Sequence, residues 1–191
     1  MRSAEYPSTT AGARIEAWTG SQFGARIDEA MQIYVRAMRY PDHTGAQRAL
    51  SARKHVTLEG FACRAALTED DTLVGFGYGY TTKPGQWWHD LVERALARES
   101  REHWLVDAFE LSELHVLPEY HGIGIGRRLL TSLAGGIPHT SMLLSTPDSD
   151  TRAFRLYRAT GFVDLARNYL FPGDARPFAV LGRRLPLRDG R

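Results

Sequence analysis

Apolar residues recur along the N-terminal half of the chain at spacings that predict both helices and strands. Residues 13–18 alternate between apolar and polar positions, which indicates a first strand. From residue 22 to residue 39 the apolar positions recur every three or four residues, so we expect one amphipathic helix that ends before Pro41. The pattern then predicts a shorter helix over 46–54 and a β-hairpin with strands at 60–67 and 73–80.

The C-terminal half continues with strands and helices in alternation. In chain order the pattern predicts a helix over 90–102, a strand over 110–116, a helix from residue 127, a strand over 141–145, a helix over 150–160 and a closing strand pair over 162–171 and 177–187. Residues 1–12 are rich in Ser, Thr, Gly and Pro, and we expect a flexible tail there and a single domain over 13–191.

Glycines at positions 75, 77 and 79 alternate with bulky residues, so one face of this strand is bare and the other is bulky. The bare face is consistent with close packing beneath a helix or with the floor of a substrate pocket. Tyr78 and Tyr80 are candidate pocket walls.

The segment from residue 82 to residue 109 is longer than a connection between two strands requires. It contains adjacent tryptophans, Trp87 and Trp88, which point in different directions in most backbones. One can anchor the segment while the other faces solvent or ligand. The segment is either a surface helix held by aromatic residues or a lid over a substrate.

A glycine-rich turn lies between the strand at 110–116 and the following helix. His121 is followed by Gly122, Gly124 and Gly126 at alternate positions, and then by two arginines. Glycines allow a tight turn in which backbone N–H groups converge at the positive end of the helix, an arrangement that binds phosphate or pyrophosphate.

The spacing of the turn excludes the commonest nucleotide-binding loops. A P-loop requires Lys followed by Ser or Thr after its last glycine, and Arg127 and Arg128 stand there. A dinucleotide-binding fingerprint requires a third glycine three residues after Gly124, and that position is Arg127.

Two segments resemble the signatures of the GNAT N-acetyltransferase superfamily, in the order in which the superfamily has them. Val116-Leu-Pro-Glu-Tyr-His121-Gly-Ile-Gly124-Ile-Gly126 resembles its acyl-CoA loop, with His121 in the place of Gln or Arg. Thr151-Arg-Ala-Phe-Arg-Leu-Tyr157-Arg-Ala-Thr-Gly161-Phe resembles its second signature, Ala-x-x-Leu-Tyr-x-x-x-Gly-Phe. The family's usual Asn before that Ala is replaced by Asp150.

The resemblance, which covers about residues 13–186, implies an α/β fold. Its centre is a mixed, mostly antiparallel sheet with a splayed strand pair, flanked by helices. It also implies acetyl-CoA as the acetyl donor, held by backbone groups of Leu114, His115 and Val116 and, at the pyrophosphate, by the turn. The positions that match the family's cofactor-binding residues are thus Leu114, His115, Val116, His121, Gly122, Gly124, Gly126, Arg127 and Asp150.

The resemblance also implies roles for two side chains in catalysis. Tyr157 matches the tyrosine that donates a proton to the departing CoA thiolate, and Glu110 matches a glutamate that deprotonates the amine through water in several family members. Glu113 and His115 remain alternative bases. Glu110 and Glu113 have opposite parity in a regular strand, so both can face one cleft only if a bulge intervenes. Glu113, with Tyr78, Tyr80, Trp87 and Trp88, is a candidate for substrate binding.

Composition narrows the function further. The chain has 191 residues, of which 43% are hydrophobic, and its net charge of +2 with no dense basic run argues against nucleic-acid binding. Cys63 is the sole cysteine and is expected in the core, so neither a disulfide nor a zinc site is expected. With no secretory or membrane-spanning segment in the sequence, we expect a cytoplasmic protein. A homodimer is compatible with the sequence, which identifies no interface.

The sequence therefore predicts an N-acetyltransferase that moves an acetyl group from acetyl-CoA directly to a primary amine, without a metal. Drugs, polyamines, amino acids and protein N-termini all remain possible acceptors. A non-catalytic CoA-binding sensor or interaction module on the same fold is the alternative, and a nucleotide-binding domain is a third possibility that predicts binding of ATP instead of CoA.

Overall fold

The structure is a computed structural model that describes residues 12–186. The predicted tail lies outside the described residues except for Gly12, so the division into tail and domain stays a prediction. The elements follow one another as β1 (Arg14–Trp18), α1 (Gly20–Ala25), α2 (Ile27–Met38), α3 (His43–His55), β2 (Ala62–Leu67), β3 (Leu73–Thr81), α4 (Trp87–Ala97), β4 (Ala108–Val116), α5 (Ile125–Gly135), β5 (Ser141–Pro147), α6 (Arg152–Ala159), β6 (Val163–Leu170) and β7 (Pro177–Arg184).

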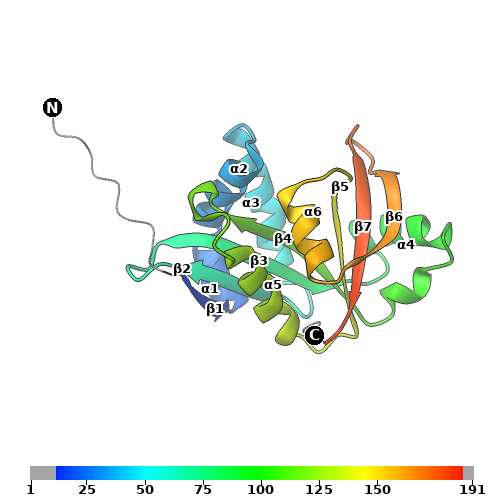
Figure 1. Cartoon of the computed structure of the whole chain (residues 1–191), viewed down its shortest axis with the longest axis horizontal. Helices are drawn as coiled ribbons and strands as arrows, with labels where there is room; N and C mark the ends of the chain where they lie inside the picture. Colours follow the sequence, from blue (N-terminus) through cyan, green and yellow to red (C-terminus); the bar gives the residue numbers. More distant parts are fainter. Residues whose placement is uncertain (1–11, 187–191) are drawn as a thin grey trace.

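The strands form one seven-stranded sheet in the order β1-β2-β3-β4-β5-β7-β6 (Figure 1). All neighbouring strands are antiparallel except β4 and β5, which run parallel. The predicted mixed, mostly antiparallel sheet is confirmed. None of the helices in residues 12–186 is long and apolar enough to cross a bilayer.

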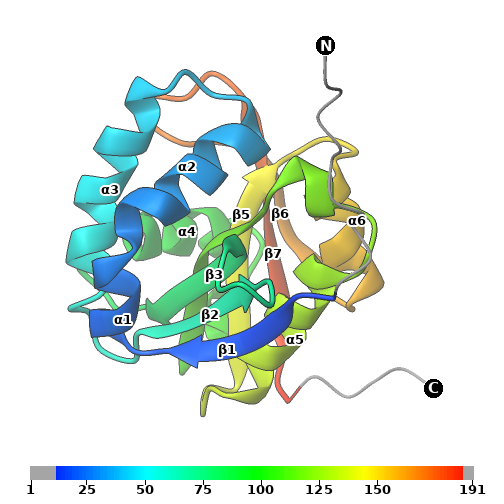
Figure 2. The same ribbon diagram turned by 90° about the vertical axis from the view of Figure 1, so that its left-hand side faces the viewer.

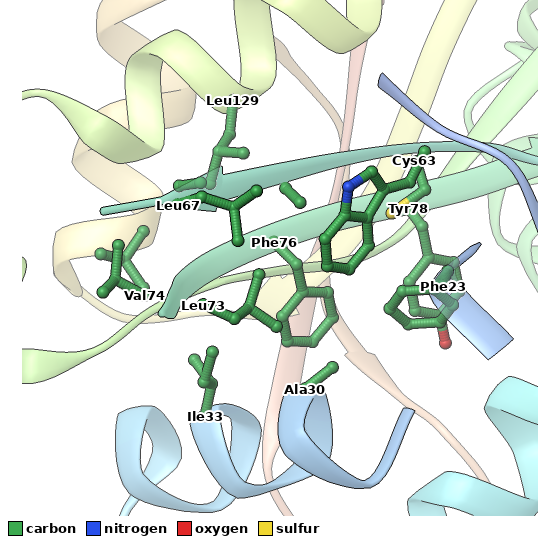
Figure 3. Packing of buried hydrophobic residues seen from close by; sticks show 14 of the residues in the cluster. Phe23, Ala30, Ile33, Cys63, Leu67, Leu73, Val74, Phe76, Tyr78 and Leu129 are labelled. Carbon is green, nitrogen blue, oxygen red and sulfur yellow. The ribbon is translucent and has the colours of Figure 1, made fainter. Parts of the chain in front are cut away.

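Helices cover both faces of the sheet (Figure 2). On one face α2 packs on β3 and β4, and α4 packs on β6. On the other face α5 crosses β1 to β4, and α6 lies against β5. Figure 3 shows Ala30 and Ile33 of α2 facing Leu73 and Phe76 of β3, with Leu129 of α5 approaching from the opposite side.

The single helix predicted over residues 22–39 is wrong, because the chain forms two helices there. Thr19 starts α1 with a capping box to Gln22, and Arg26 then leaves the helical conformation with φ −119° and ψ 19°. The helix resumes at Ile27, and the backbone N–H of Ala30 bonds to the Arg26 carbonyl at 3.0 Å. A break of one residue leaves the apolar spacing nearly unchanged, so the pattern does not reveal it.

The helix predicted over 90–102 also has other bounds. It begins at Trp87 and ends at Ala97, because Ser100 adopts a left-handed conformation with φ 54° and the Arg101 amide folds back onto the Leu96 carbonyl at 2.9 Å. A short 3-10 turn over Glu102–Leu105 follows. Leu91, Val92 and Leu96 belong to a buried apolar cluster with β5, β6 and β7. The helix is therefore part of the core rather than a loose cover.

The bare face of β3 is filled by neighbouring side chains. A Cβ atom at Gly75 would lie 3.3 Å from Leu129 of α5, and one at Gly77 would lie 2.8 Å from Leu114. A Cβ at Gly79 would lie 1.9 Å from the Glu110 carbonyl oxygen, closer than any real contact. The glycines thus allow α5 and β4 to approach β3, so this face is packed and is not the floor of a pocket.

The pairing between β4 and β5 is short. Only Ala108, Phe109 and Glu110 of β4 pair with β5, opposite residues 141–143, although β4 continues to Val116. The two strands therefore separate after Glu110, which is the splayed pair that the sequence predicted. On the side turned toward β5, the backbone of the second half of β4 has no partner strand.

Candidate active site

A cavity of about 1410 Å³ begins where β4 and β5 separate. Its volume exceeds the roughly 300–1,000 Å³ of most small-ligand pockets, so it can hold a long ligand or two ligands. The walls come from β4, β5, the starts of α5 and α6, the helices α2 and α3, and the loop between β6 and β7. We call the part near α5 and α6 the donor end and the part near α2, α3 and the β6–β7 loop the acceptor end.

The donor end is built largely from backbone. Gly122 and Gly124 have φ of 84° and 87°, a left-handed conformation that favours glycine. Gly124 caps α5 without a side-chain hydrogen bond, and the first amide to bond back to it is that of Arg128. The amides of Ile125, Gly126 and Arg127 therefore lack helical partners and are available to an anion at the positive end of the helix.

Two further contacts fix the shape of this turn. The His121 ring nitrogen Nε2 bonds to the Val116 carbonyl at 2.8 Å, which ties the turn to the end of β4. A Cβ atom on Gly126 would lie 3.3 Å from Leu156, so glycine allows α5 and α6 to come close. His121, Gly122, Gly124, Gly126 and Arg127 all line the cavity, together with Leu114, His115 and Val116 of β4.

Asp150 differs from the other predicted cofactor-binding residues. It is not among the residues that line the cavity, whereas the next three residues, 151–153, are. Its exposed carboxylate pairs with Arg155 at 2.8 Å. The structure therefore provides no geometric basis for a contact between Asp150 and a ligand in the cavity.

A β-bulge in β4 brings both glutamates to one face. Tyr78 pairs with Glu113 while the next residue, Gly79, pairs with Leu111, so Ser112 is an extra residue. Beyond the bulge Glu110 pairs with Tyr80. Because Tyr78 and Tyr80 lie two apart on the same face of β3, Glu110 and Glu113 also share a face. The opposite parity expected for a regular strand is thus removed by the bulge, and both carboxylates line the cavity.

Glu110 is a buried carboxyl group with one free oxygen and a raised pKa. Its side chain is buried, and the Tyr80 hydroxyl donates to Oε1 at 3.0 Å. The other oxygen, Oε2, is buried without a hydrogen-bond partner among the described residues. Burial raises the pKa of Glu110 to about 8, although the Tyr80 hydrogen bond and Arg48 act against that rise. A carboxylate with this pKa can gain and lose a proton near neutral pH.

Glu113 has the opposite character despite similar burial. Burial alone would raise its pKa, but the charge of Arg48 and a hydrogen bond from His115 lower it to about 2. Arg48 donates through Nε to one carboxylate oxygen, and the His115 ring contacts the other. Glu113 therefore stays ionised and organises its neighbours. Of the two glutamates, Glu110 has the pKa and the unpartnered oxygen that suit proton transfer. The ring of the third candidate, His115, is engaged by Glu113 through Nε2.

Tyr157 lies in α6 and lines the cavity from the donor end. Its ring is buried against Phe162, at 5.6 Å between ring centroids. Burial, and to a lesser degree the negative charge of Glu113, raises the pKa of Tyr157 well above its usual value, so the hydroxyl keeps its proton. Its hydroxyl makes no hydrogen bond to any of residues 12–186, which leaves the proton available to a ligand.

The structure separates the aromatic candidates for substrate binding. Tyr80, Trp87 and Trp88 line the cavity, but Tyr78 does not. Tyr78 is fully buried against Phe23, and its hydroxyl bonds to His55 Nδ1 at 3.1 Å. Trp88 is anchored by a hydrogen bond from Nε1 to Ser145 at 3.0 Å, whereas Trp87 is 62% exposed at the cavity. One tryptophan anchors and the other faces solvent, as the sequence predicted.

The sequence analysis missed Arg48 and His55, two residues of α3 that line the acceptor end. His55 packs on Tyr80 at 4.9 Å between ring centroids, and burial together with Arg48 lowers its pKa to about 4. Arg48 and His55 are seven residues apart and so lie on one face of a helix. The spacing can be read from the sequence, but it places Arg48 and His55 at the cavity only once α3 is known to lie opposite β4.

The loop between β6 and β7 closes the acceptor end. Arg176 donates to the Tyr40 hydroxyl at 3.0 Å, and its guanidinium lies over the Tyr40 ring at 5.8 Å. Asp174 holds Arg176 from the other side at 2.7 Å. In Figure 2 this loop, in orange, meets the connection between α2 and α3. We call the Arg176–Tyr40 contact the clasp.

The chain is similar to known proteins in sequence and in fold. The profile of the Acetyltransferase (GNAT) family matches residues 27–162. A GCN5-like protein acetyltransferase of Mycobacterium tuberculosis, Rv2170, is 38% identical over an alignment of 196 positions, and the match covers 87% of this chain and 95% of that protein.

Solved structures show the same fold at low sequence identity. The yncA protein from Salmonella typhimurium, solved with its cofactor acetyl-CoA, has a TM-score of 0.64 at 15% identity, and the match covers 95% of this chain and 98% of that one. A phosphinothricin acetyltransferase from Sinorhizobium meliloti, in complex with acetyl-CoA, has a TM-score of 0.61 at 19% identity, with 91% and 89% covered.

Proposed function

The chain belongs to the GNAT acetyltransferase family and is an acetyl-CoA-dependent acyltransferase, and we propose that it transfers the acetyl group directly to a primary amine, with Glu110 as the base and Tyr157 as the acid. The observation that carries this proposal is the state of Glu110. One oxygen is held by Tyr80, the other is buried and unpartnered, and the pKa is about 8 at the wall of the cavity.

The donor end fits acetyl-CoA. The free amides at the start of α5 suit a pyrophosphate, and the unpaired side of β4 offers alternating N–H and C=O groups to an amide-containing chain such as pantetheine. Arg127 and Arg152 line this end and supply positive charge. When bound, acetyl-CoA supplies an acetyl group activated as a thioester.

The remaining chemistry belongs to the protein's own residues. An amine attacks only when it is neutral, so the incoming ammonium must lose a proton, and the Glu110 carboxylate accepts it directly or through a water. As the C–N bond forms, the nitrogen carries one proton more than the amide product, and this proton passes to water as the C–S bond breaks. The departing sulfur requires a proton. The Tyr157 hydroxyl, which burial keeps protonated, donates that proton. Glu110 and Tyr157 recover their starting states by exchange with solvent.

The acceptor is proposed only as a primary amine. The relative from M. tuberculosis is named a protein acetyltransferase, so a lysine side chain in a protein is one acceptor to test beside small amines. The volume of the cavity and the exposed Trp87 are compatible with either.

Two measurements test this function. Thermal unfolding with acetyl-CoA, CoA and ATP in parallel should show stabilisation by the first two and not by ATP, because a ligand that binds the native state raises its stability. Thiol release from acetyl-CoA in the presence of an amine panel should then detect turnover, and Glu110→Gln and Tyr157→Phe should reduce it. Stabilisation by acetyl-CoA without amine-dependent thiol release from any acceptor would instead support a CoA-binding sensor.

A further inference from the structure

The charges that reach the cavity surface at the acceptor end are mainly positive. Three arginines line this end: Arg39 at the end of α2, Arg48 in α3 and Arg176 in the β6–β7 loop. The side chains of Arg48 and Arg176 are 34% and 51% exposed. The arginines thus present guanidinium donors to any ligand that enters.

The carboxylates at this end do not balance that charge for a ligand. Glu113 is ionised but only 6% exposed, and both of its oxygens are engaged by Arg48 and His115. Glu110 is 4% exposed and largely protonated below pH 8. Asp174 is occupied by Arg176. An amine that enters therefore meets no exposed, unpaired carboxylate among the described lining residues.

Two of the arginines retain unused donors. Arg48 uses only Nε, for Glu113, and its two terminal nitrogens make no hydrogen bond to any of residues 12–186. Arg39 is exposed, and its side chain makes no ion pair within the same residues. Since arginine pairs with carboxylates through two parallel hydrogen bonds, the terminal nitrogens of Arg48 form a ready site for one.

Building on the proposed function, we infer that the acceptor is a primary amine that carries a carboxylate in the same molecule, and that Arg48 binds this carboxylate with help from Arg39. The amine then lies toward Glu110 and the carboxylate toward α3. A polyamine fits poorly, because its additional ammonium groups would face the arginines without a carboxylate partner. A free amino acid and a lysine beside an acidic residue in a protein both supply the required chemistry.

Matched acceptors test the inference. We would measure kcat/KM by thiol release at saturating acetyl-CoA for tyrosine against tyramine, for methionine against its decarboxylated amine, and for a lysine peptide with Glu neighbours against the same peptide with Gln. Spermidine completes the panel. The carboxylate member of at least one pair should be used at least tenfold better, and the pair that shows this identifies the source of the carboxylate.

Variants assign the effect to the arginines. Arg39→Gln and Arg48→Gln should each lower the ratio of kcat/KM for the carboxylate member to kcat/KM for its carboxylate-free partner, with the larger loss for Arg48→Gln. Because Arg48 also holds Glu113, we expect kcat/KM for both members to fall in Arg48→Gln, and the ratio isolates the contact with the carboxylate. Arg48→Lys keeps the positive charge but loses the paired guanidinium donors, and should recover only part of the preference for the carboxylate member. Arg53→Gln is the matched control, because Arg53 lies in the same helix, pairs with Asp28 and does not line the cavity.

The outcomes separate this inference from the proposed function. Equal use of both members of every pair, a preference for spermidine, or an equal loss for both members in Arg48→Gln would overturn the inference while leaving the N-acetyltransferase intact. If acetyl-CoA stabilises the protein but no amine in the panel causes thiol release, the proposed function and the inference are overturned together.

Discussion

The two ends of the cavity are built by different means. At the donor end the groups that face a ligand are backbone amides, exposed by left-handed glycines and by a strand without a neighbour. At the acceptor end they are side chains from α2, α3 and a distant loop. Backbone groups recognise what is common to every acyl-CoA, whereas side chains change from one sequence to another. The difference explains why the donor follows from family membership and the acceptor does not.

The largest expected effect is the loss of acetyl-CoA binding when the glycine turn at the donor end is blocked. Gly124→Glu places a side chain on a backbone with φ 87° and adds a negative charge at the anion site. We expect acetyl-CoA binding to weaken by about 100-fold or more, since both geometry and charge oppose the pyrophosphate. Isothermal titration with acetyl-CoA measures this loss directly.

The control for Gly124→Glu lies at the acceptor end. Gly173 also has φ 87°, and a Cβ there would meet nothing within 4 Å. Gly173→Glu therefore carries the same strain and the same charge, and it should retain acetyl-CoA binding. Equal weakening by both variants would show that the two ends are not separate.

The next largest effect concerns the junction of the two ends, at Glu110. Glu110→Gln removes the base and should lower kcat by about 100-fold or more. The wild-type kcat should rise with pH through a midpoint near 8 and level off above it, because the pKa of Glu110 is raised to about 8 and only the carboxylate accepts a proton. A pH profile of kcat for both proteins checks this, and a midpoint near 8 that persists in Glu110→Gln would exclude Glu110 as its origin.

A smaller effect is expected from Tyr157 at the donor end. Tyr157→Phe removes the hydroxyl and retains the buried ring, so the fold should be unchanged. We expect kcat to fall about 10- to 100-fold while the KM for acetyl-CoA changes little, because the proton is required only as the thiolate departs. Steady-state kinetics at varied acetyl-CoA concentration measure kcat and the KM for acetyl-CoA separately. A large rise in KM with kcat unchanged would make Tyr157 a binding residue instead.

The smallest effect should come from the clasp at the acceptor end. Arg176→Ala breaks the contacts with Tyr40 and Asp174, which are partly exposed and therefore weak. The KM for the amine should rise about two- to fivefold with no change in the KM for acetyl-CoA. Arg94→Ala serves as the control, because Arg94 does not line the cavity. If the KM for acetyl-CoA rose as well, the clasp would influence the donor end.

The donor end was largely predictable from the sequence because its determinants are local. The turn from His121 to Gly126 and the signature around Tyr157 are each a few residues long, so each could be matched to a motif of the resembled family. The sheet and its splay were predicted through the same resemblance. Asp150 is the exception, since its carboxylate pairs with Arg155 and does not line the cavity.

The acceptor end was not predictable in the same way because its contacts join distant residues. Arg48 and Glu113 are 65 residues apart in the chain, and Arg176 and Tyr40 are 136 apart. The bulge at Ser112 depends on how β4 pairs with β3, so parity alone gave the wrong geometry for Glu110 and Glu113. The different states of these two glutamates arise from Arg48, which no local pattern places beside Glu113.

The short pairing between β4 and β5 has a mechanical consequence. Three residue pairs join these strands, whereas every other neighbouring pair in the sheet is joined over five or more. The sheet thus consists of a four-stranded and a three-stranded half that meet at a narrow seam. A ligand that lies in the gap would contact both halves, so we expect ligand binding to stabilise their association. Because so few residue pairs join the two halves, we expect the empty protein to open first at this seam.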